Sequence, residues 1–278
     1  MPLANTPPAG RPHALARFIA RHRRGLLARK FAGLARRYLE WHGNVNYDIE
    51  TNGEGFVLDT LRAFRPRILF DAGANRGDWT LAACSRHPEA LIHAFEISPP
   101  TFEALAANVA SNSRVHCNNV GLSDSEGPIT IRHYGGLSAL TTATAYPHPF
   151  EFSEITARTV RGDSYAARNG IDRIDLLKID VEGMEEAVLR GFEALFARHA
   201  IDLVQFEYGR VAILNHVLLS DFHAFFRERG YVVGKIYPVY VDFRDYDFAD
   251  EDFLGPNFLA CRKDRPDYLR AFGAGARK

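Results

Sequence analysis

The chain has 278 residues, of which 46% are hydrophobic and 24% are charged, with 34 basic and 34 acidic side chains. This is the balance of a soluble globular protein, and the length allows one large domain or two small ones with a packed core that needs no disulfides. Cys84, Cys117 and Cys261 form no CxxC pair and indicate free thiols in a reducing compartment. The sequence has no apolar run of the roughly 20 residues that span a membrane, and residues 1–13 lack a signal-peptide core, so we expect a cytoplasmic protein.

Residues 1–42 contain nine basic side chains and one acid, which leaves a net charge of −8 on the remainder. Residues 1–14 have a disordered composition, and after them apolar residues recur at near-helical spacing between arginines, with a break near Gly25. We expect an N-terminal helical extension over 1–44, followed by the catalytic domain over 45–278. Three roles are open for the amphipathic helix. It packs on that domain, it contacts an acidic partner, or its residues 11–42 lie on the anionic surface at the inner face of a membrane. Packing is the commonest role of such a helix.

The remainder alternates between strand-like and helix-like segments after a turn at Asn52–Gly53 and a short helix over 56–64. The predicted strands span 67–74, 90–97, 115–122, 127–134, 174–181, 201–208, 231–239 and 257–263. The predicted helices span 78–87, 101–112, 163–171, 184–199 and 219–230, and residues 135–158 are expected to be irregular. This alternation predicts a doubly wound, mostly parallel α/β sheet covered on both faces. The last two strands have no helix between them, so the last one is expected to be antiparallel.

A glycine-containing turn, FDAGANRGDWT, follows the strand over 67–74 and opens the next helix. Gly73 and Gly77 permit a tight turn and a close approach of the backbone to a ligand. Asn75 has a short amide that caps the helix or bonds a ligand, and Asp71 ends the strand, where its carboxylate meets a ligand ammonium directly or through water. A tight turn without a ligand is the alternative interpretation.

Polar side chains end the neighbouring strands as well. Glu96 ends the second strand about 20 residues after the glycine turn, a position that suits hydrogen bonds to a ribose diol. Asn119 and Val120 follow the third strand, where they would flank an adenine. Asp180 and Glu182 follow the strand over 174–181, and Glu207 follows the next one. Carboxylates there stabilise a cationic cofactor and accept a proton from a hydroxyl substrate, whereas Glu185 and Glu186 fit a helix N-terminus.

The segments FDAGANRGDWT, FEISP, NNVGLSDSEG and DLLKIDVEGMEEAVLRG resemble the motifs of the FkbM family of S-adenosylmethionine-dependent methyltransferases. The resemblance covers roughly residues 45–262. It implies a Rossmann-like, seven-stranded class I fold with an antiparallel last strand, and O-methylation of a sugar, glycolipid or natural-product hydroxyl. Arg76, Asp78 and Trp79 depart from the family pattern, as does VRGDSY, which retains Asp163.

The resemblance also implies roles for individual residues. The methionine part of S-adenosylmethionine would be held by Asp71, Gly73, Ala74, Asn75 and Gly77. Glu96 would hold the ribose, and Asn119 and Val120 would flank the adenine. Asp180 and Glu182 would face the methyl group and the substrate. The expected reaction is a direct in-line displacement in which Asp180 or Glu182 accepts the hydroxyl proton, with Glu207 as a third candidate.

Two loops are candidates for contact with the acceptor. Residues 134–150 are polar and rich in glycine, as in a substrate lid, and residues 237–258 interleave aromatic and acidic side chains that suit a sugar. Asp180, Glu182, Glu207 and His216 have the ligand types of a magnesium site, but no spacing indicates zinc, and we expect no metal.

The partners are expected to be small molecules or glycans. The acidic body argues against nucleic acid as a substrate. A nicotinamide-dependent oxidoreductase would share the glycine turn and Glu96, yet it leaves the block around Asp180 unexplained. A non-catalytic membrane-surface or scaffold protein with a vestigial pocket is the alternative outside enzymes.

Overall fold

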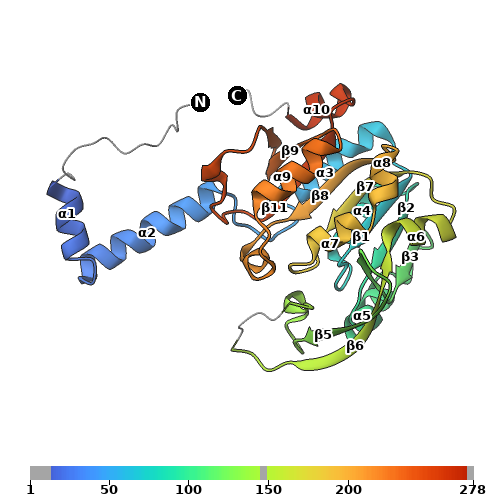
Figure 1. Cartoon of the computed structure of the whole chain (residues 1–278), viewed down its shortest axis with the longest axis horizontal. Helices are drawn as coiled ribbons and strands as arrows, with labels where there is room; N and C mark the ends of the chain where they lie inside the picture. The colour runs from blue at the N-terminus through green and yellow to red at the C-terminus, as the bar shows by residue number, and fades with distance from the viewer. Residues whose placement is uncertain (1–13, 145–148, 274–278) are drawn as a thin grey trace. The chain divides into compact units, whose positions relative to one another are not determined.

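The computed structural model describes residues 14–144 and 149–273. The disorder predicted for residues 1–14 therefore lies outside the described chain except at Ala14, where α1 begins. Contacts divide the chain into two compact units, Met1–Gly43 and Asn44–Lys278. In the first unit, α1 (Ala14–Arg21) and α2 (Leu26–His42) are separated at Gly25, where the sequence predicts the break (Figure 1). Neither helix has a buried residue. Over the described residues, we find no helix with both the length and the apolar character that crossing a bilayer requires.

The second unit is built on a large, mostly parallel sheet. Its strands lie in the order β10-β9-β11-β8-β7-β1-β2-β3. They are β1 (Ile68–Ala72), β2 (Leu91–Phe95), β3 (Val115–Asn118), β7 (Ile174–Ile179), β8 (Ile201–Glu207), β9 (Tyr231–Tyr237), β10 (Tyr240–Phe243) and β11 (Asn257–Arg262). Strand β11 runs antiparallel to both β8 and β9, between which it is inserted. Without the edge strand β10, this is the Rossmann-like seven-stranded sheet that the sequence predicts.

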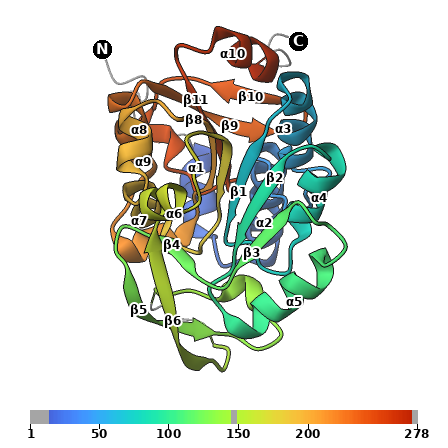
Figure 2. The same ribbon diagram turned by 90° about the vertical axis from the view of Figure 1, so that its right-hand side faces the viewer.

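Helices cover both faces of this sheet (Figure 2). Those on one face are α3 (Glu54–Leu61), α4 (Asp78–Arg86), α5 (Pro99–Val109) and α10 (Pro266–Gly273). Those on the other are α6 (Gly162–Arg168), α7 (Glu185–Arg190), α8 (Glu193–Ala197) and α9 (Leu219–Glu228). Short 3₁₀ turns complete the set: η1 (Arg62–Phe64), η2 (Ser138–Leu140), η3 (Arg210–Asn215) and η4 (Phe248–Asp250).

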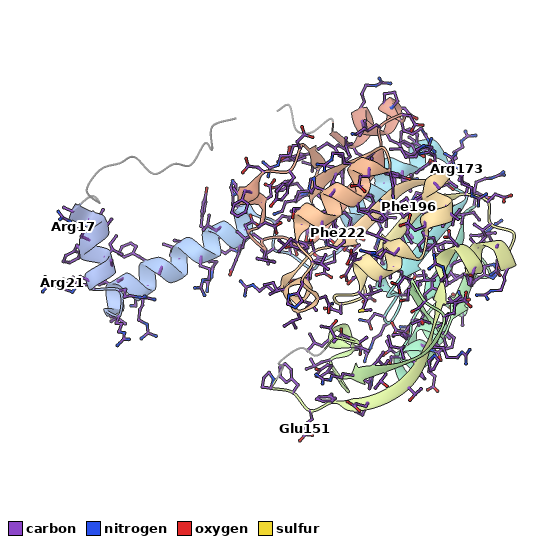
Figure 3. The ribbon with its side chains drawn as sticks, in the orientation of Figure 1. Arg17, Arg21, Glu151, Arg173, Phe196 and Phe222 are labelled. Carbon is purple, nitrogen blue, oxygen red and sulfur yellow. The ribbon has the colours of Figure 1, made fainter. Side chains whose placement is uncertain are left out.

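Two large hydrophobic cores, one on each face, hold these layers together, and a smaller cluster forms under α5. Neighbouring strand residues point to opposite faces, so Leu69 joins the core under α3 and α4 while Phe70 joins the core under α6 to α9. Phe196 of α8 and Phe222 of α9 pack into that second core (Figure 3). Because both sides of the central strands are apolar and covered, their carboxyl ends are the places where polar groups can gather.

A second sheet of three strands lies in the same unit. It consists of β4 (Gly121–Ser123), β5 (Gly127–His133) and β6 (Ser153–Arg161), in the order β4-β6-β5. The strand predicted over 127–134 is therefore confirmed. The prediction of an irregular segment over 135–158 is wrong at its end, where β6 begins. The strand predicted over 115–122 is also divided, because its last residues pair with β6 instead of continuing in the large sheet.

Three further elements differ from the sequence prediction. The long helix over 184–199 is two helices, α7 and α8, separated at Gly191, where a Cβ atom would lie 2.2 Å from the carbonyl oxygen of Ser123. The loop over 237–258 contains β10, which pairs with β9. Helix α10 was not predicted, and it contributes Tyr268 and Phe272 to a core.

Substitution of Phe70 tests the importance of the core between the sheet and helices α6 to α8. The ring is fully buried and makes edge contacts with Tyr165 and Phe192. We expect Phe70→Ala to lower the free energy of unfolding by about 3–5 kcal/mol, because it removes buried surface and leaves a cavity. Phe248→Ala is the control, since that ring is 82% exposed, and it should change stability by less than about 0.5 kcal/mol. Urea denaturation measures both, and equal effects would contradict this assignment of the core.

Candidate active site

The carboxyl ends of β1, β2, β7 and β8 bring together polar residues that are distant in sequence. Strand pairing sets Asp71 of β1 opposite Lys178 of β7, and Lys178 opposite Gln205 of β8. Asp180 follows β7 directly, and its backbone N–H donates to the carbonyl oxygen of Ala72 at 3.0 Å. Ligands of parallel α/β sheets bind at this edge. The residues predicted from the strand ends therefore lie at one edge of one sheet.

The turn over residues 73–77 is held in a conformation that excludes larger side chains. Gly73 has φ +82°, and a Cβ atom there would lie 1.8 Å from the carbonyl oxygen of Asp180. The N–H groups of Gly73 and Ala74 donate to the carbonyl oxygen of Phe95, at 3.0 and 2.9 Å. Asn75 adopts φ +49°, a left-handed conformation that asparagine tolerates. Contacts with the ends of β2 and β7 thus fix the glycine turn without help from a ligand.

Glu96 is hydrogen-bonded to the backbone of two segments, the glycine turn and the start of α5. Its carboxylate oxygens accept N–H groups from Asn75 at 2.9 Å and from Ser98 at 2.8 Å, and the side chain is buried. Burial raises the pKa of Glu96 to about 7, against the opposing effect of these two hydrogen bonds. Glu96 therefore ties the glycine turn to the start of α5, a role that its position in the sequence did not reveal.

Asn119 and Val120 lie beside this acid. The side-chain amide of Asn119 donates to the carbonyl oxygen of Glu96 at 2.9 Å, and the residue is exposed. Val120 is half-buried and packs against the core beneath α6 to α9. Both residues therefore lie next to the end of β2.

Lys178 is a buried cation among acids. Its ammonium lies 3.3 Å from a carboxylate oxygen of Asp71 and 3.2 Å from one of Asp180. Burial disfavours the charged form, but the carboxylates of Asp180, Asp71 and Glu54 outweigh it and raise the pKa of Lys178. Thr80 donates to the other oxygen of Asp71 at 2.6 Å. Asp71 is completely buried, so the structure places Lys178, rather than Asp71, against the cleft.

Three carboxylates form the centre of the site. Asp180, Glu182 and Glu207 each have an oxygen within 4.8 Å of the others, a spacing that would also fit a metal ion. His216, considered with them from the sequence, is not in this group among the described residues. Burial raises the pKa of Asp180, but the charge of Lys178 together with hydrogen bonds from Glu207 and Lys178 outweighs it, and the net direction is downward. Asp180 is therefore the fixed negative charge of the group.

The other two acids are shifted in the opposite direction. Burial, followed by the charges of Asp180 and Glu185, raises the pKa of Glu182 to about 8. Burial, followed by the charge of Asp180, raises the pKa of Glu207 well above its ordinary value. Near neutral pH, the group thus combines an ionised aspartate with two glutamates that retain protons, because neighbouring like charges resist ionisation together.

The backbone around Glu182 is strained and anchored. Glu182 adopts φ +53°, and its carbonyl oxygen accepts the hydroxyl of Thr142 at 2.7 Å. Glu185 accepts the N–H groups of Val181 and Gly183, at 3.1 and 3.0 Å. Glu186 pairs with Arg190 at 2.7 Å. Glu185 and Glu186 therefore stabilise the start of α7, as the sequence predicts. Glu182 has no such role and lies beside Asp180 and Glu207.

Residues before β1 contribute a part of the site that sequence reasoning missed. Glu54 is buried and accepts hydrogen bonds from Asn52 at 2.8 Å and from Gln205 at 2.6 Å. A cleft extends over these groups. It is lined by Tyr47, Ile49, Asn52, Glu54, Gly73, Ala74, Asn75, Asp78, Trp79, Lys178, Asp180, Glu207, Pro256 and Asn257. One signal in the sequence could have revealed these buried polar groups: Lys178 lies inside an otherwise apolar strand and needs acidic partners.

The two loops expected at the mouth differ in their contacts. Ser138 donates to the side-chain oxygen of Asn75 at 2.8 Å, and Asn215 donates to Thr144 at 2.9 Å. With the bond from Thr142 to Glu182, residues 134–144 therefore contact the glycine turn, the turn after β7 and η3. Residues 145–148 lie outside the described chain. From the loop predicted over 237–258, the cleft lining includes Pro256 and Asn257, the residue at which β11 begins.

A doubly wound sheet with an antiparallel strand inserted near one edge is the Rossmann-like fold of S-adenosylmethionine-dependent methyltransferases, and its carboxyl edge here carries an acid-lined cleft. Sequence comparison narrows this class. Residues 71–233, more than half of the chain, match the Methyltransferase FkbM domain. The chain belongs to the FkbM methyltransferase family.

The chain is also similar to individual proteins over part of its length. The chain is 31% identical over 195 residues to the hexuronic acid methyltransferase AglP of Haloferax volcanii, covering 67% of this chain and 78% of that protein. It is 33% identical over 155 residues to the 31-O-demethyl-FK506 methyltransferase FkbM of Streptomyces tacrolimicus, covering 45% and 59%. The crystal structure of Methyltransferase FkbM from Methylobacillus flagellatus superposes with a TM-score of 0.40 at 15% identity, over 70% of this chain and 44% of that one. The chain spans about 60% of the length of two of the curated relatives that it matches.

The close approach at Gly73 can be tested against a glycine of similar conformation. Gly136 has φ +78°, but a Cβ atom there meets nothing within 4 Å. We expect Gly136→Ala to cost about 1–2 kcal/mol for the left-handed backbone alone. Gly73→Ala should cost about 3 kcal/mol or more, because the turn must also move away from Asp180. Chemical denaturation of both variants makes the comparison, and equal losses would show that the turn has room to relax.

Proposed function

We propose that this methyltransferase transfers a methyl group to a hydroxyl oxygen of a sugar, glycolipid or natural product, with a carboxylate of the acid cluster as the proton acceptor. The observation that carries the proposal is the group of Asp180, Glu182 and Glu207, in which acids of unlike pKa lie within 4.8 Å of one another. An alcohol gives up its proton as it reacts, so an oxygen acceptor needs a base at this place. The relatives named for hexuronic acid and 31-O-demethyl-FK506 support acceptors of this kind.

Bound S-adenosylmethionine would supply an electrophilic methyl group on a positively charged sulfonium. The residues present fit such a cofactor, because Gly73, Ala74 and Asn75 line the cleft together with the ionised Asp180. We assign the methionine part to the turn over 73–77, with Asp71 acting through Lys178. The ribose is assigned to Glu96, and the adenine to the neighbourhood of Asn119 and Val120.

Among the three acids, Glu182 is the best candidate for the base. Lys178 lowers the pKa of Asp180, which makes that carboxylate a weak proton acceptor. The pKa of Glu207 is raised well above its ordinary value, so Glu207 keeps its proton and bonds to Asp180. The pKa of Glu182 is about 8, close to the pH at which the enzyme would work, where general bases are most effective. Asp180 then orients the acceptor hydroxyl, and Glu182 takes its proton.

The proposal is tested by transfer of a labelled methyl group from S-adenosylmethionine to a panel of sugars, glycolipids and small alcohols. We expect label in an oxygen-linked methyl group and an increase in melting temperature with S-adenosylmethionine or S-adenosylhomocysteine, but not with NAD. Label found only on nitrogen or carbon would overturn O-methylation. A melting temperature that responds to NAD alone would favour the oxidoreductase.

Glu182→Gln tests the base directly. We expect kcat to fall about 10²- to 10⁴-fold, with little change in the affinity for S-adenosylmethionine. In the unchanged enzyme, kcat should rise with pH through about 8, because Glu182 accepts a proton only after losing its own. This rise should be absent in Glu182→Gln. The control is Glu186→Gln, which removes a carboxylate paired with Arg190 within α7 and should keep both kcat and the pH profile. An unchanged profile in Glu182→Gln would assign the base elsewhere.

A further inference from the structure

Helix α2 has one apolar face that nothing in the proposed reaction uses. The five residues that form it follow one another at alternating steps of four and three, which aligns them along one side of a helix. They are Leu27, Phe31, Leu34, Tyr38 and Trp41, each between 61% and 72% exposed. Isolated exposed apolar residues are ordinary, but a continuous stripe that includes three aromatic residues marks a surface that binds a partner.

Helix α1 repeats this arrangement on a smaller scale. Leu15, Phe18 and Ile19 are 51–61% exposed, and they lie on the side away from Arg17 and Arg21. Those two arginines project from the same side of α1 in Figure 3. Both helices of the first unit therefore combine an exposed apolar face with basic side chains.

The charges around the α2 stripe are of one sign. Lys30 and Arg37 each precede an aromatic residue of the stripe and border it along one side, while Arg29 and Arg36 lie on the opposite side of the helix. Glu40 is the one acid between residues 14 and 43. Long basic side chains at the edge of an apolar stripe can extend their charges toward phosphate groups while their carbon chains remain with the apolar side chains.

We propose that the face of Leu27, Phe31, Leu34, Tyr38 and Trp41 binds the surface of a membrane that contains anionic lipids. Such a surface offers apolar chains beneath a layer of negative charge, which matches an apolar stripe bordered by Lys30 and Arg37. Tyr38 and Trp41 are the residue types that favour the boundary between lipid and water. The helix lies in this boundary and does not cross the bilayer.

A second copy of the chain fits this face less well. In a coiled coil, alternating steps of four and three place the stripe at the paired core positions, with Lys30 and Arg37 at one flank and Ala28 and Ala35 at the other. An antiparallel pair would bring the basic flanks together, and a parallel pair would set them against alanines. Neither arrangement compensates the charge, and bulky Phe31, Tyr38 and Trp41 fill core positions that leucine and isoleucine usually occupy.

The test is flotation of the full chain with lipid vesicles. Vesicles of phosphatidylcholine with about 30% phosphatidylglycerol should bind the protein, and pure phosphatidylcholine vesicles should bind it much less. Raising the salt from about 50 to about 300 mM should weaken the binding, because the attraction between exposed charges is screened. Binding that ignores both lipid charge and salt, or no binding at all, overturns the proposal.

Matched variants locate the binding face. Lys30→Gln with Arg37→Gln should lower the partition coefficient roughly tenfold or more, since each basic residue near the surface contributes. Arg29→Gln with Arg36→Gln removes the same charge from the opposite side of the same helix and should have a smaller effect. Phe31→Ser with Leu34→Ser should abolish binding. Equal losses from the two charge pairs would overturn the assignment of the face.

Two further measurements distinguish a loss of lipid binding from misfolding and from self-association. Every variant should keep the melting temperature of the catalytic unit and its shift with S-adenosylmethionine, so that lost vesicle binding is not lost folding or lost cofactor binding. Sedimentation should show whether the chain self-associates. One result would assign the face to a second copy and overturn the membrane proposal. In it, the unchanged chain is a dimer that does not bind vesicles, and Phe31→Ser with Leu34→Ser converts it to a monomer.

Discussion

The ion pairs of Lys178 are the constraint on which the acid-lined cleft depends. An ammonium group buried in the sheet is stable only if carboxylates compensate it, and Asp71 and Asp180 do so at 3.3 and 3.2 Å. In return, the lysine keeps Asp180 ionised. That negative charge, together with burial, is what holds protons on Glu182 and Glu207. A single cation inside the sheet thereby sets unlike protonation states for three carboxylates that line or adjoin one cleft.

Much of the fold could be predicted because the central strands and helices have clear patterns in their own local sequence. Buried strands read as apolar runs, and the missing helix before the last strand correctly indicates its antiparallel direction. Other elements lack such a signal. The segment over 115–122 looks like one strand, yet it leaves the large sheet after Asn118, because the position of β6 decides where Gly121–Ser123 pairs. Likewise, the break at Gly191 reflects close contact with Ser123, about 70 residues away in the sequence.

The site was predictable to the same extent. Strand ends identify Asp180, Glu182 and Glu207, because parallel strands deliver their last residues to one edge. The partners of these residues were not visible. Gln205 and Glu54 are about 150 positions apart, and only the register between β7 and β8 brings the network of Lys178 together with them. Glu96 has the predicted position, but its bonds to Asn75 and Ser98 depend on the exact path of two loops.

The segment over 134–144 links two parts of the site that the chain builds separately. Ser138 bonds to Asn75 in the glycine turn, and Thr142 bonds to the carbonyl oxygen of Glu182. A displacement of this segment that opens the first contact also loosens the strained backbone of the second. One short segment therefore braces both the glycine turn and the backbone of Glu182, so the positions of these two parts of the site depend on each other.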